Sequence, residues 1–335
     1  MIVSYSISIT IPSIFQYREV RMRKYCLGVD IGGTSVKLGF FSEEGQLIDK
    51  WEIPTRREEK GKYVLEDIAD SIHKKLDQMQ VEKEDIIGVG IGVPGPITKD
   101  GTVLKCANLG WDVFNVGKEA TRLLGITTKV GNDANVAALG EMWQGGGKGY
   151  RNLVTVTLGT GVGGGVIIDG EILPGSTGAA GEIGHLLVNY EEQETCGCGK
   201  TGCLEQYASA TGIVKEGKRL LEKSDKPSKL RMVEALTAKA IFDCAIEGDS
   251  LAKELVDSLG RYLGIALSHV AGVVDPEVFV IGGGVSRAGK ILIDVIEKHY
   301  NQNVMFALKG KEFKLATLGN DAGIYGCAKL ALGLK

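Results

Sequence analysis

Proline, basic charge and long apolar runs are all scarce in this chain. Only 7 of its 335 residues are proline, which excludes a collagen-like chain and argues against a disordered, low-complexity one. Lys and Arg number 39 against 42 Asp and Glu, giving a net charge of −3. Without a basic surface, the chain is not expected to bind nucleic acid or an anionic membrane. No run of about 18 apolar residues occurs, which excludes a transmembrane helix.

Disulfide bonds and secretion are not expected either. The 7 cysteines are an odd number in a chain too long to need a disulfide framework. Residues 1–21 are no signal peptide, because the basic residues from Arg21 onward follow the apolar part and Pro12 interrupts it. We predict a cytoplasmic protein in which residues 1–21 are a non-native or flexible extension and Met22 is the natural start.

Glycine is abundant, with 48 of 335 residues, about twice the usual share. The glycines cluster between apolar runs, so we expect them in turns and where backbone faces a ligand. The length predicts two domains.

One pattern occurs twice. Residues 26–41 read as strand, glycine turn and strand, with a third strand at 46–53, and residues 153–173 repeat this order. The pairs Gly33-Thr34 and Gly159-Thr160 mark the two turns. We interpret this as an internal duplication, with chance similarity of glycine turns as the alternative. Further strands are expected at 86–93 and 278–281, and helices at 64–76, 251–274, 288–300 and 322–332, the last packing back on the first unit.

The glycine turns suit phosphate groups. Glycine lets backbone N–H groups approach an anion, and a threonine hydroxyl adds a donor. Asp30, just before the first turn, is a candidate Mg²⁺ ligand, and Lys37 is placed to reach a phosphate. Neither turn matches the Walker A or dinucleotide-binding pattern. One such turn alone would be an ordinary hairpin, but two favour a nucleotide clamp.

Four residues form a candidate zinc site: His185, Cys196, Cys198 and Cys203. Three thiolates and an imidazole suit tetrahedral Zn²⁺, and four protein ligands make a closed, structural site. The alternative is a group of buried free cysteines, which suits the isolated cysteines elsewhere better than this polar, glycine-rich loop.

A further candidate site lies in the segment 131–135, between an expected strand and a helix running to about residue 143. One Asx residue would suffice to cap that helix, but Asn132, Asp133 and Asn135 are all present. Near a helix N-terminus Asp133 stays ionised and can accept a proton from an attacking hydroxyl.

Three more polar residues stand in apolar or glycine-rich loops: Asn108, Glu182 and Glu205. A polyhydroxylated ligand needs a ring of such donors and acceptors. Taken singly, each is equally well explained as a helix cap or a surface residue.

Together these motifs resemble the ROK family of repressors and sugar kinases. The resemblance is carried by residues 30–34, 158–185 and 196–205, covers residues 24–334, and is closest to the family's bacterial glucokinases. It implies an α/β, actin-like, hexokinase-type (ribonuclease H-like) fold with a duplicated βββαβα core and an interdomain cleft. The implied smaller domain spans 22–131 and 315–335, and the larger, with the zinc loop and nucleotide-binding turns, spans 132–314.

The resemblance also implies the activity: phosphorylation of D-glucose at its 6-hydroxyl by Mg-ATP, the first step of glycolysis, in a homo-oligomer (dimer or tetramer). Asp133 is the implied base, and Asn108, Asn132, Glu182, His185 and Glu205 match sugar-binding residues. His185 would use one ring nitrogen for zinc and the other for the sugar. The implied nucleotide sites are Gly32, Gly33, Thr34, Gly159, Thr160 and Gly161 at the phosphates, with Lys37, and Gly282, Gly283 and Gly284 beside the adenosine.

Two alternatives stay open. The acceptor sugar could instead be N-acetylmannosamine, fructose, allose or another hexose, since pocket shape around the 2-position decides this. The chain could also be a sugar-sensing regulator, although we expect no DNA-binding helix-turn-helix, and Asp133 is intact. Polyphosphate as donor would need a basic track that the sequence does not provide.

Overall fold

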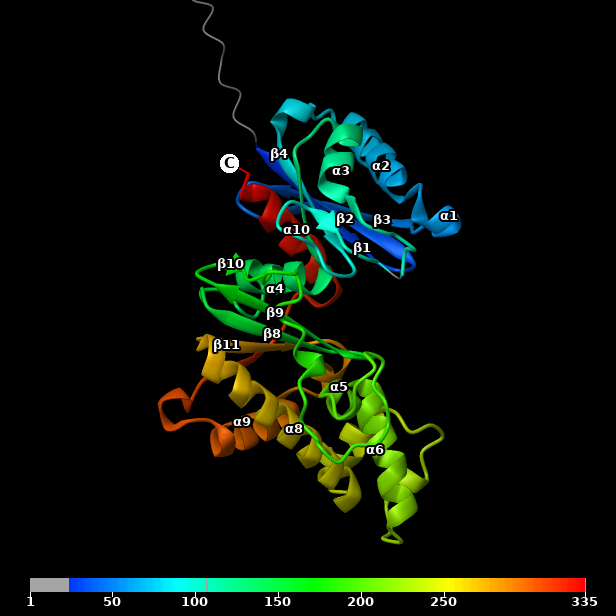
Figure 1. The fold of residues 1–335 in the computed structure, drawn as a ribbon, viewed down its shortest axis with the longest axis vertical. Helices are drawn as coiled ribbons and strands as arrows, with labels where there is room; N and C mark the ends of the chain where they lie inside the picture. The colour runs from blue at the N-terminus through cyan, green and yellow to red at the C-terminus, as the bar shows by residue number, and fades with distance from the viewer. Residues whose placement is uncertain (1–23, 107, 335) are drawn as a thin grey trace, which may run out of the picture.

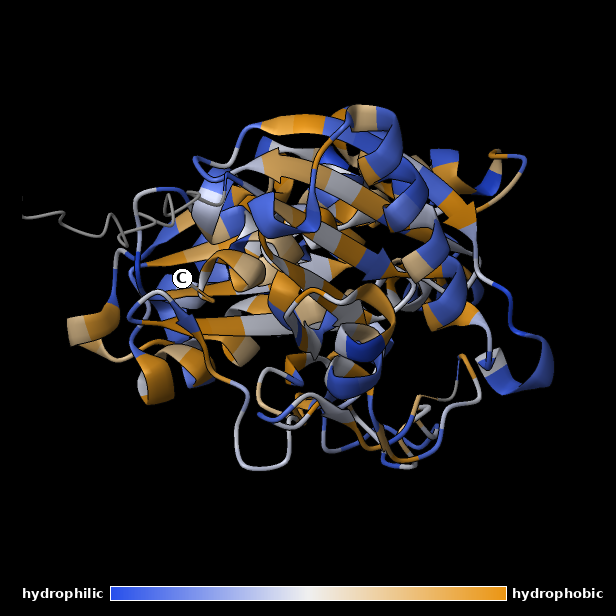
Figure 2. Cartoon of the chain, turned by 90° about the horizontal axis from the view of Figure 1, so that it is seen from above, coloured by the Kyte–Doolittle hydropathy of each residue, from blue (hydrophilic) through white to orange (hydrophobic). Residues whose placement is uncertain are grey.

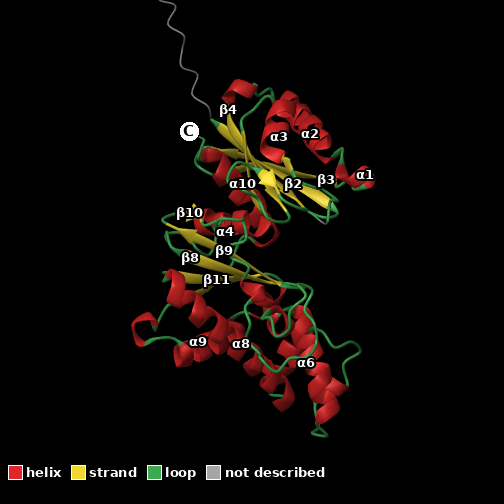
Figure 3. Cartoon of the chain, in the orientation of Figure 1, coloured by secondary structure: helices red, strands yellow, loops and turns green. Residues whose placement is uncertain are grey.

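The structure, a computed structural model, describes residues 24–106 and 108–334. The predicted extension at 1–21 and the predicted start at Met22 therefore lie outside the described residues. Two five-stranded sheets stand one above the other in Figure 1, with helices between them and on their outer faces. Figure 3 shows the same layering, with strands in yellow and helices in red.

The first sheet has the strand order β3-β2-β1-β4-β7. β1 pairs antiparallel with β2 and parallel with β4, β2 pairs antiparallel with β3, and β4 pairs parallel with β7. Its strands are β1 Tyr25–Ile31, β2 Ser35–Ser42, β3 Leu47–Pro54, β4 Ile86–Val93 and β7 Thr128–Asn132. A separate ribbon pairs β5 Thr102–Val103 with β6 Phe114–Asn115.

The second sheet repeats this plan, with the order β10-β9-β8-β11-β12 and the same sequence of antiparallel and parallel pairs. Its strands are β8 Leu153–Leu158, β9 Val162–Ile168, β10 Glu171–Ile172, β11 Val278–Gly282 and β12 Glu312–Leu315. The matching topologies confirm the internal duplication.

Strand register corrects how the two turns were aligned. Asp30 pairs with Lys37 and Gly92, and Thr157 occupies the equivalent position, paired with Gly163 and Gly282. Asp30 and Thr157 are each the second-last residue of their strand, so the two Gly-Thr pairs are one residue out of step. The first turn is also one residue longer, because seven positions separate Asp30 from Lys37 and six separate Thr157 from Gly163. A shift of one residue reverses the face on which a strand side chain lies, so the equivalent of Asp30 is Thr157.

Helices cover the outer faces of both sheets. α1 Glu58–Gly61, α2 Val64–Met79 and α3 Val116–Leu124 cover the first, and the second carries α5 Glu205–Ala208, α6 Ala210–Lys223, α7 Ala238–Ile246, α8 Ser250–Val274 and α9 Lys290–Asn303. Ile68 and Ile72 of α2 and Leu263 and Leu267 of α8 are fully buried on the faces that meet the sheets. Figure 2 shows apolar strands inside and polar residues along the outer helices. None of the described helices is long and apolar enough to cross a membrane.

Between the sheets lie α4 Asp133–Gln144 and α10 Ala322–Leu332, coloured green and red in Figure 1. α4 follows the last strand of the first sheet, but its main partner among the strands is β9, and α10 follows the second sheet but packs on β1 and β4. The two helices cross where Gly140 and Gly326 meet, and a Cβ on Gly326 would lie 1.5 Å from the Val136 carbonyl oxygen. The expected return of the last helix to the first unit is confirmed.

This crossing also corrects the expectation that the glycines serve turns and ligands. On the first sheet, a Cβ on Gly28 would lie 2.0 Å from the Ile324 carbonyl oxygen, and one on Gly90 would lie 1.8 Å from that of Cys327. These glycines admit α10 to the sheet at backbone contact distance. Part of the glycine excess therefore serves packing between the two units.

Candidate active site

A cleft of about 1000 Å³ lies between the two units. It receives residues from β1, β2, the start of α4, both strands β8 and β9, and the segments after β11 and β12. The predicted site residues that line it are Asp30, Gly32, Gly33, Lys37, Asn108, Asn132, Asp133, Glu182, Gly282, Gly283 and Gly284. Thr34, Gly159, Thr160, Gly161, His185 and Glu205 are not among its lining residues.

Asp133 is the first residue of α4, directly after β7. Asn132 caps the helix, its side chain accepting from the Asn135 backbone N–H at 3.1 Å. The Asn132 amide donates to Asp133 Oδ1 at 3.0 Å, and the Ala134 backbone N–H donates to the same oxygen at 2.9 Å. Asp133 Oδ1 is thereby fixed, and the other carboxylate oxygen stays available for a ligand in the cleft.

The cleft holds two interacting carboxylates. Burial and the charge of Asp133 raise the pKa of Asp30, against the opposing charge of Lys37, to about 6. Burial also raises the pKa of Asp133, against the hydrogen bonds that it accepts. A cation between them would relieve this repulsion, so the donor set fits a divalent metal ion. Gly323 makes room for Asp30, because a Cβ there would lie 2.4 Å from Asp30 Oδ2.

Lys37 faces Asp30 from the neighbouring strand and donates from Nζ to the Asn320 carbonyl oxygen at 3.0 Å. Asn320 also lines the cleft. The lysine thus joins β2 to the segment that precedes α10. Its charge lowers the pKa of Asp30, and its ammonium group is suitably placed to attract phosphate oxygens.

Hydrogen bonds from the start of α6 hold the second turn, 159–161. The Gly159 carbonyl oxygen accepts from the Ala210 backbone N–H at 2.8 Å, and the Thr160 carbonyl oxygen accepts from the Thr211 hydroxyl at 2.8 Å. Beside it, a Cβ on Gly283 would lie 2.5 Å from the Leu158 carbonyl oxygen. The turn therefore adjoins the cleft at Gly283, although it is not part of the lining.

Three cysteines and one histidine come together next to this turn. The ligand atoms of His185, Cys196, Cys198 and Cys203 all lie within 4.8 Å of one another. Cys198 Sγ is 3.6 Å from Cys203 Sγ, and Cys196 Sγ is 3.8 Å from His185 Nδ1. The edges of a tetrahedral zinc site are about 3.6–3.8 Å, given Zn–S near 2.3 Å and Zn–N near 2.0–2.1 Å. The cluster fits one metal ion.

The histidine is oriented toward the cluster. Burial raises the pKa of the Cys203 thiol to about 12, and a metal ion bound by the four residues would lower it by stabilising the thiolate. His185 turns Nδ1 to the cysteines, while Nε2 lies 4.0 Å from Glu182 Oε2. Glu182 lines the cleft, so the histidine connects the cluster with the cleft.

Glu205 connects the cluster with the second turn. Its Oε2 accepts from the Val162 backbone N–H at 3.3 Å, and its Oε1 lies 3.3 Å from Cys196 Sγ. Gly161 leaves space for this carboxylate, because a Cβ there would lie 2.4 Å from Oε2. Glu205 therefore stands between the metal cluster and the turn and lies outside the main cleft.

A buried ion pair supports the loop that carries the cysteines. Arg219 of α6 donates to both oxygens of Glu192, at 2.9 and 3.3 Å, and the Tyr207 hydroxyl donates to Glu192 at 2.6 Å. Bonding from Arg219 holds the pKa of Glu192 well below its usual range. Sequence reasoning missed this pair, because its partners are far apart in the chain and no motif joins them.

Three further cleft residues were also missed: Glu141, Thr155 and Thr157. The two threonines alternate in the buried strand β8, so they lie on one face; Thr155 Oγ1 is buried without a partner. That alternation in an otherwise apolar strand was a usable signal.

Glu141 holds together the two segments by which the chain passes from one unit to the other. Its Oε2 accepts from the Gly146 backbone N–H at 2.8 Å and from that of Thr317 at 3.1 Å, and its Oε1 accepts from that of Leu318 at 2.9 Å. The carboxylate is 2% exposed. It fixes the segment between β12 and α10 to the end of α4.

Two sheets of this topology around a cleft define the actin-like, hexokinase-type class of two-domain α/β proteins. The ROK family model matches residues 26–333, and the chain belongs to the ROK family. It is 44% identical over 308 residues to a glucokinase of Halalkalibacterium halodurans, covering 90% of this chain and 93% of that protein.

Solved structures agree with this assignment. A ROK family glucokinase from Streptomyces griseus in complex with glucose and AMPPNP matches with a TM-score of 0.71 and 33% identity, over 91% of this chain and 98% of that one. A ROK hexokinase from Thermus thermophilus matches with a TM-score of 0.74 and 30% identity, over 91% and 96%. The sequence-based expectation of the fold class is confirmed.

Proposed function

We propose that this chain is a glucokinase, which transfers the γ-phosphoryl group of ATP to the 6-hydroxyl of D-glucose. One observation carries the proposal: Asp133 stands in the cleft with one carboxylate oxygen fixed and the other unengaged by described residues, opposite Asp30 and between two glycine turns. A relative named glucokinase at 44% identity supports the choice of sugar.

In this proposal Asp133 receives the proton of the 6-hydroxyl as that oxygen attacks the γ-phosphorus. The bond between the γ-phosphorus and the β,γ-bridging oxygen breaks, and ADP leaves. Burial raises the pKa of Asp133, which makes its carboxylate a stronger base than a solvated aspartate. Phosphoryl transfer needs little covalent assistance, so a positioned base and clamped phosphates are sufficient.

The sugar would be held by residues that line the cleft between the two units. Asn108, Asn132 and Glu182 line the cleft with Asp133, and we assign them to sugar hydroxyls. Glu205 and His185 would complete the ring from the side of the metal cluster. The backbone of 32–34, 159–161 and 282–284, with Lys37, would receive the nucleotide phosphates and the adenosine.

Two metal ions belong to the proposal. Asp30 would hold Mg²⁺, which neutralises charge on the transferring phosphoryl group. The four-residue cluster would hold Zn²⁺ as a structural ion that orders the loop 186–204. His185 would then be oriented by the metal through Nδ1, so that its other ring nitrogen faces the sugar.

Initial rates with ATP across a hexose panel, read out as ADP formed, test the sugar. We expect glucose to have the highest kcat/KM among glucose, fructose, allose, mannose and N-acetylmannosamine. If fructose or N-acetylmannosamine exceeded glucose about tenfold, the acceptor would be wrong but the kinase would stand. Sugar binding without any ADP formation would instead indicate a regulator.

A further inference from the structure

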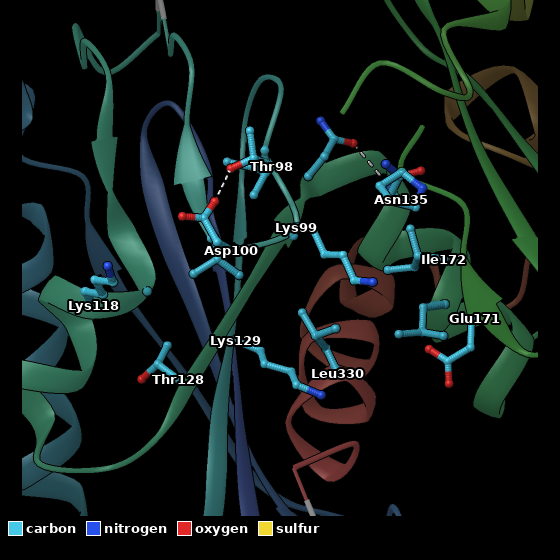
Figure 4. A pocket seen from close by; sticks show the side chains of 18 of the residues that line it. Thr98, Lys99, Asp100, Lys118, Thr128, Lys129, Asn135, Glu171, Ile172 and Leu330 are labelled. Atoms are coloured by element: carbon cyan, nitrogen blue, oxygen red, sulfur yellow. Dashed lines mark hydrogen bonds between the residues drawn. The ribbon is translucent and has the colours of Figure 1, made fainter. Parts of the chain in front are cut away.

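A second cavity, of about 770 Å³, lies on the other side of α4. The first unit contributes the loop 97–101, the start of α3 and β7, and the second contributes Glu171, Ile172 and Pro174. Figure 4 shows these walls facing each other across the space. The volume falls within the range of small-molecule sites, which occur preferentially between domains.

Three lysines line one wall of the cavity: Lys99, Lys118 and Lys129. Among the described residues the ammonium groups of Lys99 and Lys118 have no partner, and that of Lys129 bonds only the Gly333 carbonyl oxygen, at 2.7 Å. In Figure 4 the side chains of Lys99 and Lys129 extend into the space.

Two acidic residues also line the cavity, Asp100 and Glu171, so the three lysines outnumber them by one. Asp100 is on the same wall as the lysines, and its oxygens accept from the hydroxyls of Thr98 and Thr102 and from the Asn115 amide. Glu171 is on the opposite wall and has no partner among the described residues. At the start of α3 the backbone N–H groups of Gly117 and Lys118 already donate, to the Gly101 carbonyl oxygen and to the Asn115 side chain.

A buried polar group without a partner lies at the inner end. Asn135 of α4 lines the cavity, is 4% exposed, and its Oδ1 has no hydrogen-bond partner among the described residues. Leaving such an oxygen unsatisfied is unfavourable. A ligand with a hydroxyl group would satisfy it once the neighbouring side chains move slightly.

We propose that this cavity is a binding site for a small phosphate ester that carries hydroxyl groups, separate from the catalytic cleft. Lys99 and Lys129 bind the phosphate, and Asn135 accepts from a hydroxyl. Asn132 lines both cavities, and both units form the walls. A ligand here therefore favours one relative position of the units and changes the affinity of the cleft for its sugar.

The test is calorimetric titration of the full chain with glucose 6-phosphate and with inorganic phosphate, after the cleft has been filled with saturating glucose and AMPPNP. We expect glucose 6-phosphate to bind still, and more tightly than inorganic phosphate. Binding that disappears when the cleft is filled would overturn the proposal, because the phosphate would then occupy the cleft alone. The proposed choice of glucose fails separately, in the hexose panel.

Variants locate the site. Lys99→Glu combined with Lys129→Glu should weaken glucose 6-phosphate binding at least about tenfold, whereas Lys74→Glu, an exposed lysine of α2, should not. Glu171→Gln should tighten binding several-fold by removing the opposing charge. Equal Kd values in the double variant and Lys74→Glu, or no change in Glu171→Gln, would overturn the assignment.

Discussion

The two halves of the duplicated core share a topology but differ in chemistry at equivalent positions. At the end of its first strand the first half has Asp30, and the second has Thr157. After its fifth strand the first half continues directly into α4 with Asp133, whereas the second passes through residues 316–321 before α10. The first half supplies the two interacting aspartates of the cleft, Asp30 and Asp133.

The second half supplies donors and support. Its glycine turn is backed by α6, and the long insertion between its strands β10 and β11 contains the metal cluster and most helices. The duplication thus provides two similar loops facing one cleft. In the proposed function the base comes from the first half, and both halves hold the ligands. The helix α4 follows the first sheet but packs on the second, and α10 follows the second sheet but packs on the first. A movement of one half therefore displaces a helix that packs on the other.

The largest effect is expected from removing the Asp133 carboxylate, which distinguishes the first half. Asp133→Asn should retain glucose binding and lower kcat by roughly 10²–10⁴-fold, as expected for loss of a general base. Steady-state kinetics and calorimetric glucose titration measure both quantities. Asp112→Asn, at an exposed loop position, is the matched control. Unchanged turnover in Asp133→Asn would remove this residue from the mechanism.

The same variant has a stability consequence of defined sign. Because burial raises the pKa of Asp133 in the folded state, the folded protein binds the proton more tightly than the unfolded chain. Stability from this group is therefore present below the ordinary aspartate pKa and is lost as pH rises through the raised value. At neutral pH, Asp133→Asn should unfold at a higher temperature than the parent, a difference that shrinks in acid.

The second-largest effect is expected at the candidate zinc site of the second half. Cys198→Ser should reduce bound zinc from about one ion per chain to a small fraction and raise the KM for glucose about 10–100-fold. Cys198 is exposed, so the change leaves the core intact. Cys244→Ser, in α7 and away from the cluster, should keep its zinc. Elemental analysis with parallel kinetics measures this, and a zinc-free enzyme with full glucose affinity would contradict the link through His185.

Sequence reasoning found the strands, the turns and the cysteine cluster because each rests on local patterns. Buried strands have continuous apolar runs, and the cluster residues lie close together in the chain. It could not find Glu141 or the pair of Glu192 and Arg219, because their partners come from distant segments. It also placed the two Gly-Thr pairs in register, whereas only strand pairing reveals that Asp30 corresponds to Thr157.

A smaller effect should follow from weakening the support of the cysteine loop. Glu192→Gln removes the most buried of the carboxylates that pair with Arg219 and leaves Glu194 and Glu216. It should lower the free energy of unfolding by about 1–2 kcal/mol, discounted for the partial exposure of the arginine. Since Arg219 lowers the pKa of Glu192, the parent loses this stability as pH falls below the ordinary glutamate value. Chemical denaturation at neutral and acid pH measures both, and Glu119→Gln, an exposed ion-paired carboxylate, is the control. Parallel losses in both variants would contradict a special role for Glu192.

The smallest effect tests how the halves are joined. In Glu141→Gln one amide group replaces a carboxylate that accepts from three backbone N–H groups, so at least one donor loses its acceptor, at a cost of about 1–3 kcal/mol. Thr317 lies in the cleft wall, so the KM for ATP should rise a few-fold while kcat stays nearly constant. A matched loss in kcat, with an unchanged KM for ATP, would mean that Glu141 acts on the position of Asp133 along α4, and the two halves would then be coupled through the helix instead of through the segment 316–321.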